Sequence, residues 1–267
     1  MGIKIKIAYD EEQMRIACKL AALVLDYIKP YVVAGVSTNK LDQLCHDYIV
    51  HDLDSYPSPL NYQPDPSVAP YPKSTCISLN SVICHGIPNE QVLKDGDILN
   101  IDITVTTKTG YFGDTSRMFK VGEVSNIAER LCCNTLECLW LGIMQVRPGN
   151  TLGDIGCAIQ THAENNGYSV VREFCGHGIG TEFHEDNAEI VHYGRKGQGA
   201  KLVEGMIFTI EPMINQGKRD IRFQKDGWVV VTKDRSLSAQ YEHTVLVTRD
   251  GYEVLTISPE MQNNPFK

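Results

Sequence analysis

The chain contains the stretch Asp95-Gly96-Asp97-Ile98-Leu99-Asn100-Ile101-Asp102 and repeats it 109 residues later as Glu204-Gly205-Met206-Ile207-Phe208-Thr209-Ile210-Glu211. Each copy opens with an acid and a glycine, continues as an apolar run typical of a β-strand, and places an acid six residues after the glycine. An ionised carboxylate in an apolar run is costly to bury unless another charge compensates it. The repeat therefore predicts two related half-domains that deliver carboxylates to one place, which we expect to be a metal site.

The sequence before each copy is repeated as well. Apolar residues recur at helical spacing from Asp10 to Lys29 and from Ile127 to Val146, and each run ends near a proline and a glycine. A shorter helix follows each run, capped by Ser37 or Thr38 in the first case and by Thr151 in the second. Strands are expected over three ranges, Ile98 to Val105, Met206 to Ile214 and Tyr241 to Val247.

This order of elements predicts an α/β fold. We expect one domain over residues 1–267, in which two pseudo-symmetric helix-helix-strand halves, about 1–122 and 123–257, share a sheet. The Pro-rich segment from Tyr56 to Pro72 holds half of the 12 prolines. Because proline cannot donate to a strand ladder, we expect this segment to be a loop without regular pairing.

Composition excludes several classes of protein. The net charge is −8 and basic residues form no long run, so nucleic acid is a poor candidate for the main ligand. No stretch approaches about 18 uninterrupted apolar residues and the first residues lack the apolar core of a secretory signal, so we expect a cytoplasmic protein without a membrane span. The nine cysteines show no CxxC spacing, which indicates reduced thiols rather than a disulfide framework.

Two acids lie close together at the first copy of the repeat. Asp102 shares one face of its strand with Asn100 and Thr104, and a turn around Lys108 leads to a return strand with Asp114. If the hairpin is symmetric about Lys108, Asp102 and Asp114 stand directly opposite one another. Two facing carboxylates repel unless a cation or a shared proton lies between them.

The second half adds two acids and a set of histidines. Glu211 and Glu242 both lie in apolar, strand-like runs. His177 lies between glycines, where backbone can approach a ligand closely, and His184 and His85 belong to similar short motifs. We expect four of the remaining histidines to be ordinary core or surface residues and leave His243 open; the four are His46, His51, His162 and His192.

The charge of these acids favours two metal ions. Two divalent cations about 3.5–4 Å apart would neutralise four carboxylates. One histidine among four acids favours Mn, Fe(II) or Co over a thiolate-type zinc site. Two ions that share a water lower its pKa to about 7 and so supply a hydroxide nucleophile. The residues therefore predict a metal-dependent hydrolase.

Five short motifs give the chain a close resemblance to type I methionine aminopeptidases, over about Ile3 to Ile257. The motifs are Cys84-His85-Gly86-Ile87-Pro88, Gly113-Asp114-Thr115-Ser116, Gly176-His177-Gly178-Ile179-Gly180, Thr209-Ile210-Glu211-Pro212 and Ser238-Ala239-Gln240-Tyr241-Glu242-His243-Thr244. The resemblance implies the pita-bread fold, whose two α/β halves share a curved antiparallel sheet. It also implies removal of the initiator methionine from nascent proteins when the second residue is small.

The resemblance implies a role for each candidate metal ligand. Asp102 and Asp114 resemble the ligands of one ion, and His177 and Glu211 those of the other. Asp114 and Glu242 would bridge both, and Glu211 would also accept a proton from the attacking water. Co, Mn, Fe(II), Zn or Ni are the divalent ions that this resemblance admits.

The resemblance implies further roles around the metal site. His184 resembles the imidazole that stabilises the developing oxyanion, and His85 the one near the leaving group. The methionine pocket would draw on Tyr71, Cys76, Phe183 and Trp228 alongside both histidines, because apolar and sulfur-aromatic contacts suit a thioether. A monovalent-cation site is implied at Asn80, Val82 and Ser238.

One departure from the bacterial pattern concerns the rim of the pocket. Bacterial members usually carry Gly-Tyr-x-Gly ahead of the Tyr-Pro-Lys-Ser motif, and Ser67-Val68-Ala69-Pro70 occupies that place here. An aromatic wall is therefore either missing or supplied by Tyr62.

Two alternatives remain open at this point. A prolidase or aminopeptidase P shares the fold but usually carries a separate N-terminal domain, for which this chain has no room. A non-catalytic pita-bread protein would bind RNA, ribosomes or histones, but the predicted ligands are all retained. We expect a monomer that acts on the N-termini of nascent chains, associates transiently with the ribosome and binds neither a specific nucleic acid nor a membrane.

Overall fold

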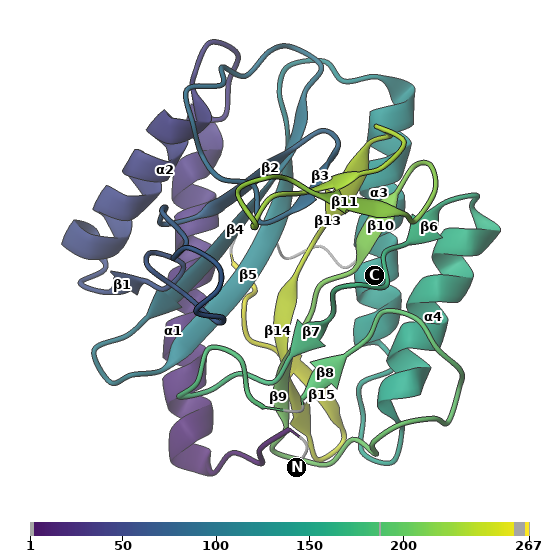
Figure 1. Cartoon of the computed structure of the whole chain (residues 1–267). Helices are drawn as coiled ribbons and strands as arrows, with labels where there is room; N and C mark the ends of the chain where they lie inside the picture. The colour runs from purple at the N-terminus through teal and green to yellow at the C-terminus, as the bar shows by residue number, and fades with distance from the viewer. Residues whose placement is uncertain (1–2, 187, 259–264, 267) are drawn as a thin grey trace.

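The computed structural model describes residues 3–186, 188–258 and 265–266, so the outermost residues of the predicted domain, 1–2 and 267, lie outside them. Helices form close to the predicted positions, as α1 (Ala8–Ile28), α2 (Thr38–Asp47), α3 (Asn126–Ile143) and α4 (Leu152–Asn165). Figure 1 shows α1 and α2 on one side of the molecule and α3 and α4 on the other, with strands between them. We keep the division near residue 122 as a proposal and use it to name the two halves.

Side-chain caps fix where these helices begin. Ser37 Oγ accepts a hydrogen bond from the Lys40 N–H at 3.2 Å and so caps α2, which selects Ser37 over Thr38. Asp154 accepts the Thr151 N–H at 2.7 Å at the start of α4. Short helical turns extend α1 and α2, as η1 (Lys29–Tyr31) and η2 (Tyr48–Asp52).

The first half is built around one regular strand pair. β4 (Ile98–Thr106) pairs with β5 (Phe112–Lys120) over nine residues, and β2 (Cys76–Leu79) pairs with its other edge. That edge also receives β1 (Tyr56–Pro57), so the prediction that the whole segment from Tyr56 to Pro72 lacks strand pairing was wrong. β1 lies at the edge of the sheet, the position where a proline is tolerated.

The strands of the second half are shorter and shift between sheets. One three-stranded sheet contains β9 (Ile207–Ile210), β14 (His243–Thr248) and β15 (Gly251–Val254), and another contains β6 (Ser169–Val170), β10 (Met213–Asn215) and β13 (Ser238–Gln240). The predicted strand 206–214 was therefore wrong as a continuous element, because it breaks at Glu211-Pro212 between β9 and β10. The predicted strand 241–247 is continuous as β14 and begins two residues later than expected, after Tyr241-Glu242, where the chain passes from one sheet to the other.

The remaining strands complete the sheets beside the site. β3 (Val82–Cys84), β11 (Ile221–Phe223) and β12 (Val230–Thr232) form one, and β7 (Gly176–His177) pairs with β8 (Glu189–Ile190). All strand pairs within the described ranges are antiparallel. An isolated bridge between Ser116 and Glu242 joins the strands of the two halves.

Alternation along the repeated strands separates the core from the site. The predicted apolar face of β4, Leu99, Ile101, Ile103 and Val105, packs with α1 and α2 in a buried cluster, as expected. Phe208 and Ile210 of β9 belong to the cluster under α3 and α4. The polar residues of both copies consequently face the space between the halves. No helix among the residues described is both long and apolar enough to cross a bilayer.

Candidate active site

One pocket of about 310 Å³ brings together all five predicted metal ligands and all six predicted substrate-binding residues. Among its walls are Asp102, Asp114, His177, Glu211 and Glu242, and also Tyr71, Cys76, His85, Phe183, His184 and Trp228. Asp114 and Glu242 are buried, and the other three predicted ligands are half-buried. Residues as far apart in the chain as Tyr71 and Glu242 thus meet at a single site.

The first-half acids come from β4 and β5, with a register one step away from the predicted one. Asp102 pairs with Ser116 and Asp114 pairs with Thr104, so the expectation that the two acids stand directly opposite was wrong. The turn is longer than predicted and centres on Thr109, because Gly110 adopts a left-handed φ of +84°. Both acids still share one face, as diagonal neighbours.

The second-half acids lie at the two strand breaks. The Glu211 carboxylate accepts a hydrogen bond from Thr209 Oγ1 at 2.9 Å and another from Gln240 Nε2 at 3.2 Å. Thr209 Oγ1 also accepts the His177 N–H at 3.0 Å. Thr209 of β9 therefore contacts both Glu211 and the backbone of His177 in β7, which orients two of the predicted ligands.

Repulsion between the acids is visible in their electrostatics. Burial, and then the charge of Asp114, raises the pKa of Asp102 and of Glu242 well above the usual range. Burial also raises the pKa of Glu211, although the charge of His177 opposes this effect. Among the described residues that line the pocket, none is a lysine or an arginine.

This donor set fits divalent cations. Ligand atoms of Asp114, His177 and Glu242 lie within 4.8 Å of one another, and His177 Nε2 lies 3.4 Å from Asp114 Oδ2 and 3.8 Å from Glu211 Oε1. Carboxylate oxygens with one imidazole are ligands of hard and borderline ions. The cations would supply the positive charge that the pocket walls lack.

The two predicted catalytic histidines, His85 and His184, line the same pocket. Burial lowers the pKa of His85 to about 4, so its ring is neutral at pH 7. His184 is more exposed, its ring lies 4.1 Å from that of His177, and its Nδ1 is 2.9 Å from the hydroxyl of Tyr62. Tyr62 lines the pocket, so this residue supplies the aromatic wall that the sequence left in doubt.

The apolar part of the pocket is an aromatic box. The rings of Tyr71 and Trp228 meet edge to face at 5.2 Å, and Phe183 lies 5.0 Å from Tyr62. Trp228 Nε1 donates to the carbonyl of Ala69 at 2.7 Å, which attaches this wall to the Pro-rich loop. With Cys76 beside them, these rings form a surface suited to an unbranched thioether.

Two of the predicted monovalent-cation residues are in contact with each other. The Ser238 N–H donates to the carbonyl of Asn80 at 2.9 Å, and Asn80 has a left-handed φ of +53°. Val82 begins β3 two residues further along and pairs with Val231. The cation itself stays a prediction.

Several residues that support the site were not predicted. His192 was classed as ordinary, but its buried Nε2 accepts the Glu211 N–H at 3.0 Å. Thr104 Oγ1 donates to Asp114 at 2.9 Å. His243, which was left open, is buried, lies 2.8 Å from the Thr256 hydroxyl through Nδ1 and packs on Trp140. Only the polarity of Thr104 and Thr209 within apolar runs could have indicated the two hydroxyl contacts.

The glycines around His177 allow close packing against neighbouring protein. A Cβ at Gly176 would lie 2.3 Å from the Thr209 carbonyl, and a Cβ at Gly178 would lie 2.6 Å from Glu185 Oε2. The ligand-bearing segment can therefore lie close to β9 and to Glu185 only because these side chains are absent.

A model of metallopeptidase family M24 matches residues 12–249. The chain belongs to metallopeptidase family M24. As a family M24 member it is a metal-dependent hydrolase, as predicted. The nine cysteines are free thiols, which also agrees with the prediction.

Relatives of this M24 chain match it over nearly their whole length. It is 54% identical over 258 residues to a methionine aminopeptidase of Escherichia coli (strain K12), with 96% of this chain and 95% of the relative covered. It is 52% identical to that of Rickettsia prowazekii (strain Madrid E), with 99% of each covered. The crystal structure of the Rickettsia prowazekii protein matches with a TM-score of 0.91 and covers 96% of this chain and 100% of that one. The predicted pita-bread fold is thereby confirmed.

Prolidases of known structure share the fold at lower identity. The prolidase from Pyrococcus furiosus matches with a TM-score of 0.73 at 20% identity, and this chain covers 65% of it. Such a similarity shows a common fold alone. Neither alternative, a prolidase-type enzyme or a non-catalytic binding protein, is favoured by the full-length relatives.

Proposed function

We propose that the chain removes the N-terminal initiator methionine from nascent proteins whose second residue is small. The observation that carries this proposal is that the acid and imidazole cluster and the aromatic-thiol box line the same pocket. A methionine side chain in the box would place the first peptide bond of a substrate beside the carboxylates. A large second side chain would crowd the groups around them.

Two divalent cations fit the five predicted ligands. Asp102 and Asp114 would hold one ion, His177 and Glu211 the other, and Asp114 and Glu242 would bridge them. When bound, the cations lower the pKa of a water and polarise the substrate carbonyl. Mn, Fe(II), Co, Zn and Ni all accept this mixture of carboxylate and imidazole ligands.

The chain's own residues supply proton transfer and orientation. Glu211 would accept a proton from the attacking water, since burial raises the pKa of its carboxyl and so makes the carboxylate a stronger base. His184 would donate a hydrogen bond to the developing oxyanion while Tyr62 orients its ring. Neutral His85 would contact the leaving-group side.

A release assay on Met-Ala-Ser tests this proposal. Metal-free enzyme supplied with Mn or Co should release free methionine from Met-Ala-Ser much faster than from Met-Leu-Ser. Ala-Pro-Ser and Leu-Pro should stay intact, because cleavage of either would indicate an aminopeptidase P or prolidase activity. The Glu211→Gln variant should lose activity. No methionine at any metal concentration would contradict the proposal.

Asn80, Val82 and Ser238 are proposed to hold a monovalent cation. The left-handed Asn80 and its bond to Ser238 bring backbone carbonyls of β3 and β13 together beside Gln240, which contacts Glu211. Replacing K⁺ with a large organic cation in the assay should lower activity if the site is occupied.

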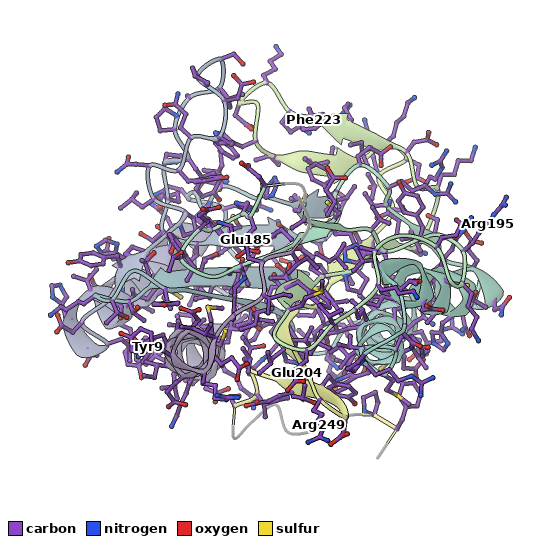
Figure 2. The ribbon with its side chains drawn as sticks, turned by 90° about the horizontal axis from the view of Figure 1, so that it is seen from below. Tyr9, Glu185, Arg195, Glu204, Phe223 and Arg249 are labelled. Carbon is purple, nitrogen blue, oxygen red and sulfur yellow. The ribbon has the colours of Figure 1, made fainter. Side chains whose placement is uncertain are left out.

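The exposed basic residues and the free thiols support proposals for the partner of the protein and for its location in the cell. Six basic residues lie exposed within residues 218–235, although the chain as a whole carries −8; they are Lys218, Arg219, Arg222, Lys225, Lys233 and Arg235. Figure 2 shows Phe223, in the middle of this segment, at one rim of the molecule. Such a patch beside the pocket suits transient contact with ribosomal RNA. A cytoplasmic monomer agrees with the free thiols, and salt-dependent co-sedimentation with ribosomes tests the contact.

A further inference from the structure

The loop between β7 and β8 carries two of the residues that line the pocket, yet it has little regular structure. Phe183 and His184 lie on this loop, whose backbone bonds include Glu185 N–H to the Gly178 carbonyl at 2.9 Å. The ring of Phe183 stacks on Phe112 at 5.6 Å. These contacts do not explain how the end of the loop beside His184 is held in place.

A buried ion pair holds that end. Lys6 Nζ contacts Glu185 Oε1, and the two side chains are only 6% and 2% exposed. The other carboxylate oxygen, Oε2, accepts the backbone N–H of Lys4 at 3.0 Å, and Lys6 Nζ also donates to the Lys4 carbonyl at 3.1 Å. In the view of Figure 2, Glu185 lies near the middle of the molecule.

The segment that supplies Lys6 is itself attached to the second copy of the acid-glycine repeat. The Lys6 N–H donates to the Gly205 carbonyl at 2.8 Å, and Ile5 forms a bridge with Met206. Residues 4–6 therefore connect β9, which leads to Glu211, with the carboxylate that directly follows His184.

Two glycines leave room for this connection. A Cβ at Gly180 would lie 2.9 Å from Lys6 Cε, and a Cβ at Gly205 would lie 2.8 Å from Ile5 Cγ2 and 3.0 Å from the Lys6 carbonyl. Gly205 of the second repeat copy and Gly180, the last residue of the motif around His177, thus leave space for the same N-terminal segment.

We propose that Lys6 and Glu185 are positioning residues, which hold Phe183 and His184 in place for the reaction through the N-terminal segment. This inference rests on the proposed function. A buried ion pair is poor evidence of stability, because well-packed apolar residues often stabilise as much or more. Beyond packing, the pair fixes the orientation of the Glu185 carboxylate, since both of its oxygens are engaged in charge-assisted hydrogen bonds. Neither side chain lines the pocket, so their effect passes through the loop.

The double variant Lys6→Met/Glu185→Leu separates positioning from stability, because it leaves no unpaired buried charge. We expect thermal unfolding within a few degrees of the parent, but kcat/KM for Met-Ala-Ser at least about tenfold lower, with kcat reduced and KM raised. The matched control is Arg117→Met/Asp26→Leu. It removes another buried pair, at 2.9 Å between β5 and α1, and should leave kcat and KM unchanged.

A second measurement does not depend on activity. In the metal-free protein, the NMR signal of the His184 ring should shift or broaden in the double variant and not in the control. The variant Glu185→Gln, which keeps an acceptor for the Lys4 N–H, should show a smaller change. A double variant with parental kinetics and a parental His184 signal would overturn the proposal. So would failure of all these Lys6 and Glu185 variants to fold, because the pair would then serve the whole fold. If the parent releases no methionine, the proposed function fails while the NMR comparison still tests the connection.

Discussion

The two halves of the molecule deliver their acids to the pocket in different ways. In the first half, Asp102 and Asp114 are fixed by nine consecutive pairs between β4 and β5. In the second half, Glu211 and Glu242 lie where strands break and change sheets. Backbone register positions the first pair, whereas Glu211 is oriented by hydrogen bonds that its carboxylate accepts from Thr209 and Gln240 and by one that its backbone N–H donates to His192. The two halves thus hold their acids at one site in different ways, the first by strand pairing and the second by hydrogen bonds at strand breaks.

The largest expected effect is on the first-half acids themselves. Asp102→Asn should lower kcat/KM by more than about 100-fold, the most that loss of an outer hydrogen-bond partner usually costs. It should also stabilise the metal-free chain at pH 7. The folded pKa of Asp102 is raised, so stability is lost as the pH rises from the unfolded value near 4 towards the folded value.

Asparagine is neutral throughout and removes that loss. A gain of about 1 kcal/mol or more, or about 2–4 °C in Tm for each kcal/mol, is expected in scanning calorimetry at pH 7. Added Mn or Co should then stabilise the variant less than the parent. An unchanged or lower Tm for the metal-free variant would show that the acids do not repel one another.

A matched pair of hydroxyl deletions compares the two kinds of support directly. Thr209→Val should reduce activity or metal affinity by about 10–100-fold, because its hydroxyl contacts both Glu211 and His177. Thr104→Val removes one bond to Asp114 and should cost about tenfold at most, because the ladder still holds that residue. Calorimetric titration with Mn and steady-state kinetics measure both. Equal losses of activity and metal affinity in the two variants would contradict the proposed difference in how the two halves hold their acids.

The two pocket histidines, His85 and His184, should both weaken the fold in acid. His85 has a folded pKa of about 4 against about 6.5 when unfolded, so stability falls as the pH drops from 6.5 to 4. His85→Asn should reduce the loss between pH 7 and pH 5 by up to about 2 kcal/mol. Asparagine also tolerates the left-handed φ of +54° at this position. His184→Asn should reduce the loss in the same way, because burial and the charge of His177 lower the pKa of that ring to about 2. Urea unfolding at the two pH values tests both variants.

The smallest expected difference lies in the glycines of the repeat. Gly96 and Gly205 have φ values of +89° and +86°, so alanine at either should cost about 1 kcal/mol in backbone strain. A Cβ at Gly96 would meet only the Glu123 carbonyl at 3.8 Å, whereas at Gly205 it would crowd Ile5 and Lys6. We expect Gly205→Ala to cost about 1 kcal/mol more than Gly96→Ala in urea unfolding. Equal losses of unfolding free energy in the two variants would mean that Ile5 and Lys6 move aside without cost.

Local patterns were enough to predict the helices and the acids and His177 of the metal site, whereas the aromatic and thiol walls of the pocket followed from the family resemblance of five motifs. The four helices begin and end within a few residues of expectation, because caps and apolar spacing are local signals. The residues of the five motifs meet in one pocket because the two copies of the acid-glycine repeat form equivalent strands that lie near each other. The register of the first hairpin was missed, because turn length depends on where Gly110 takes its left-handed φ.

Other features depend on contacts that no local pattern reveals. The break at Glu211-Pro212 lies inside an apolar run, and only Pro212 interrupts it. His192 reaches Glu211 across 19 residues, and Lys6 reaches Glu185 across 179. A buried charge in a short N-terminal segment has no periodicity that would name its partner.

The two tryptophans occupy contrasting places, and this gives the protein built-in optical probes. Trp140 is buried in the second-half core against His243. Trp228 forms a wall of the pocket, with its indole N–H bonded to Ala69 and its ring near Tyr71 and His85. Emission from Trp228 responds to the polarity of the pocket, while Trp140 reports on the integrity of the core. Ligand entry and unfolding can therefore be followed separately in the unlabelled chain by replacing either indole with phenylalanine.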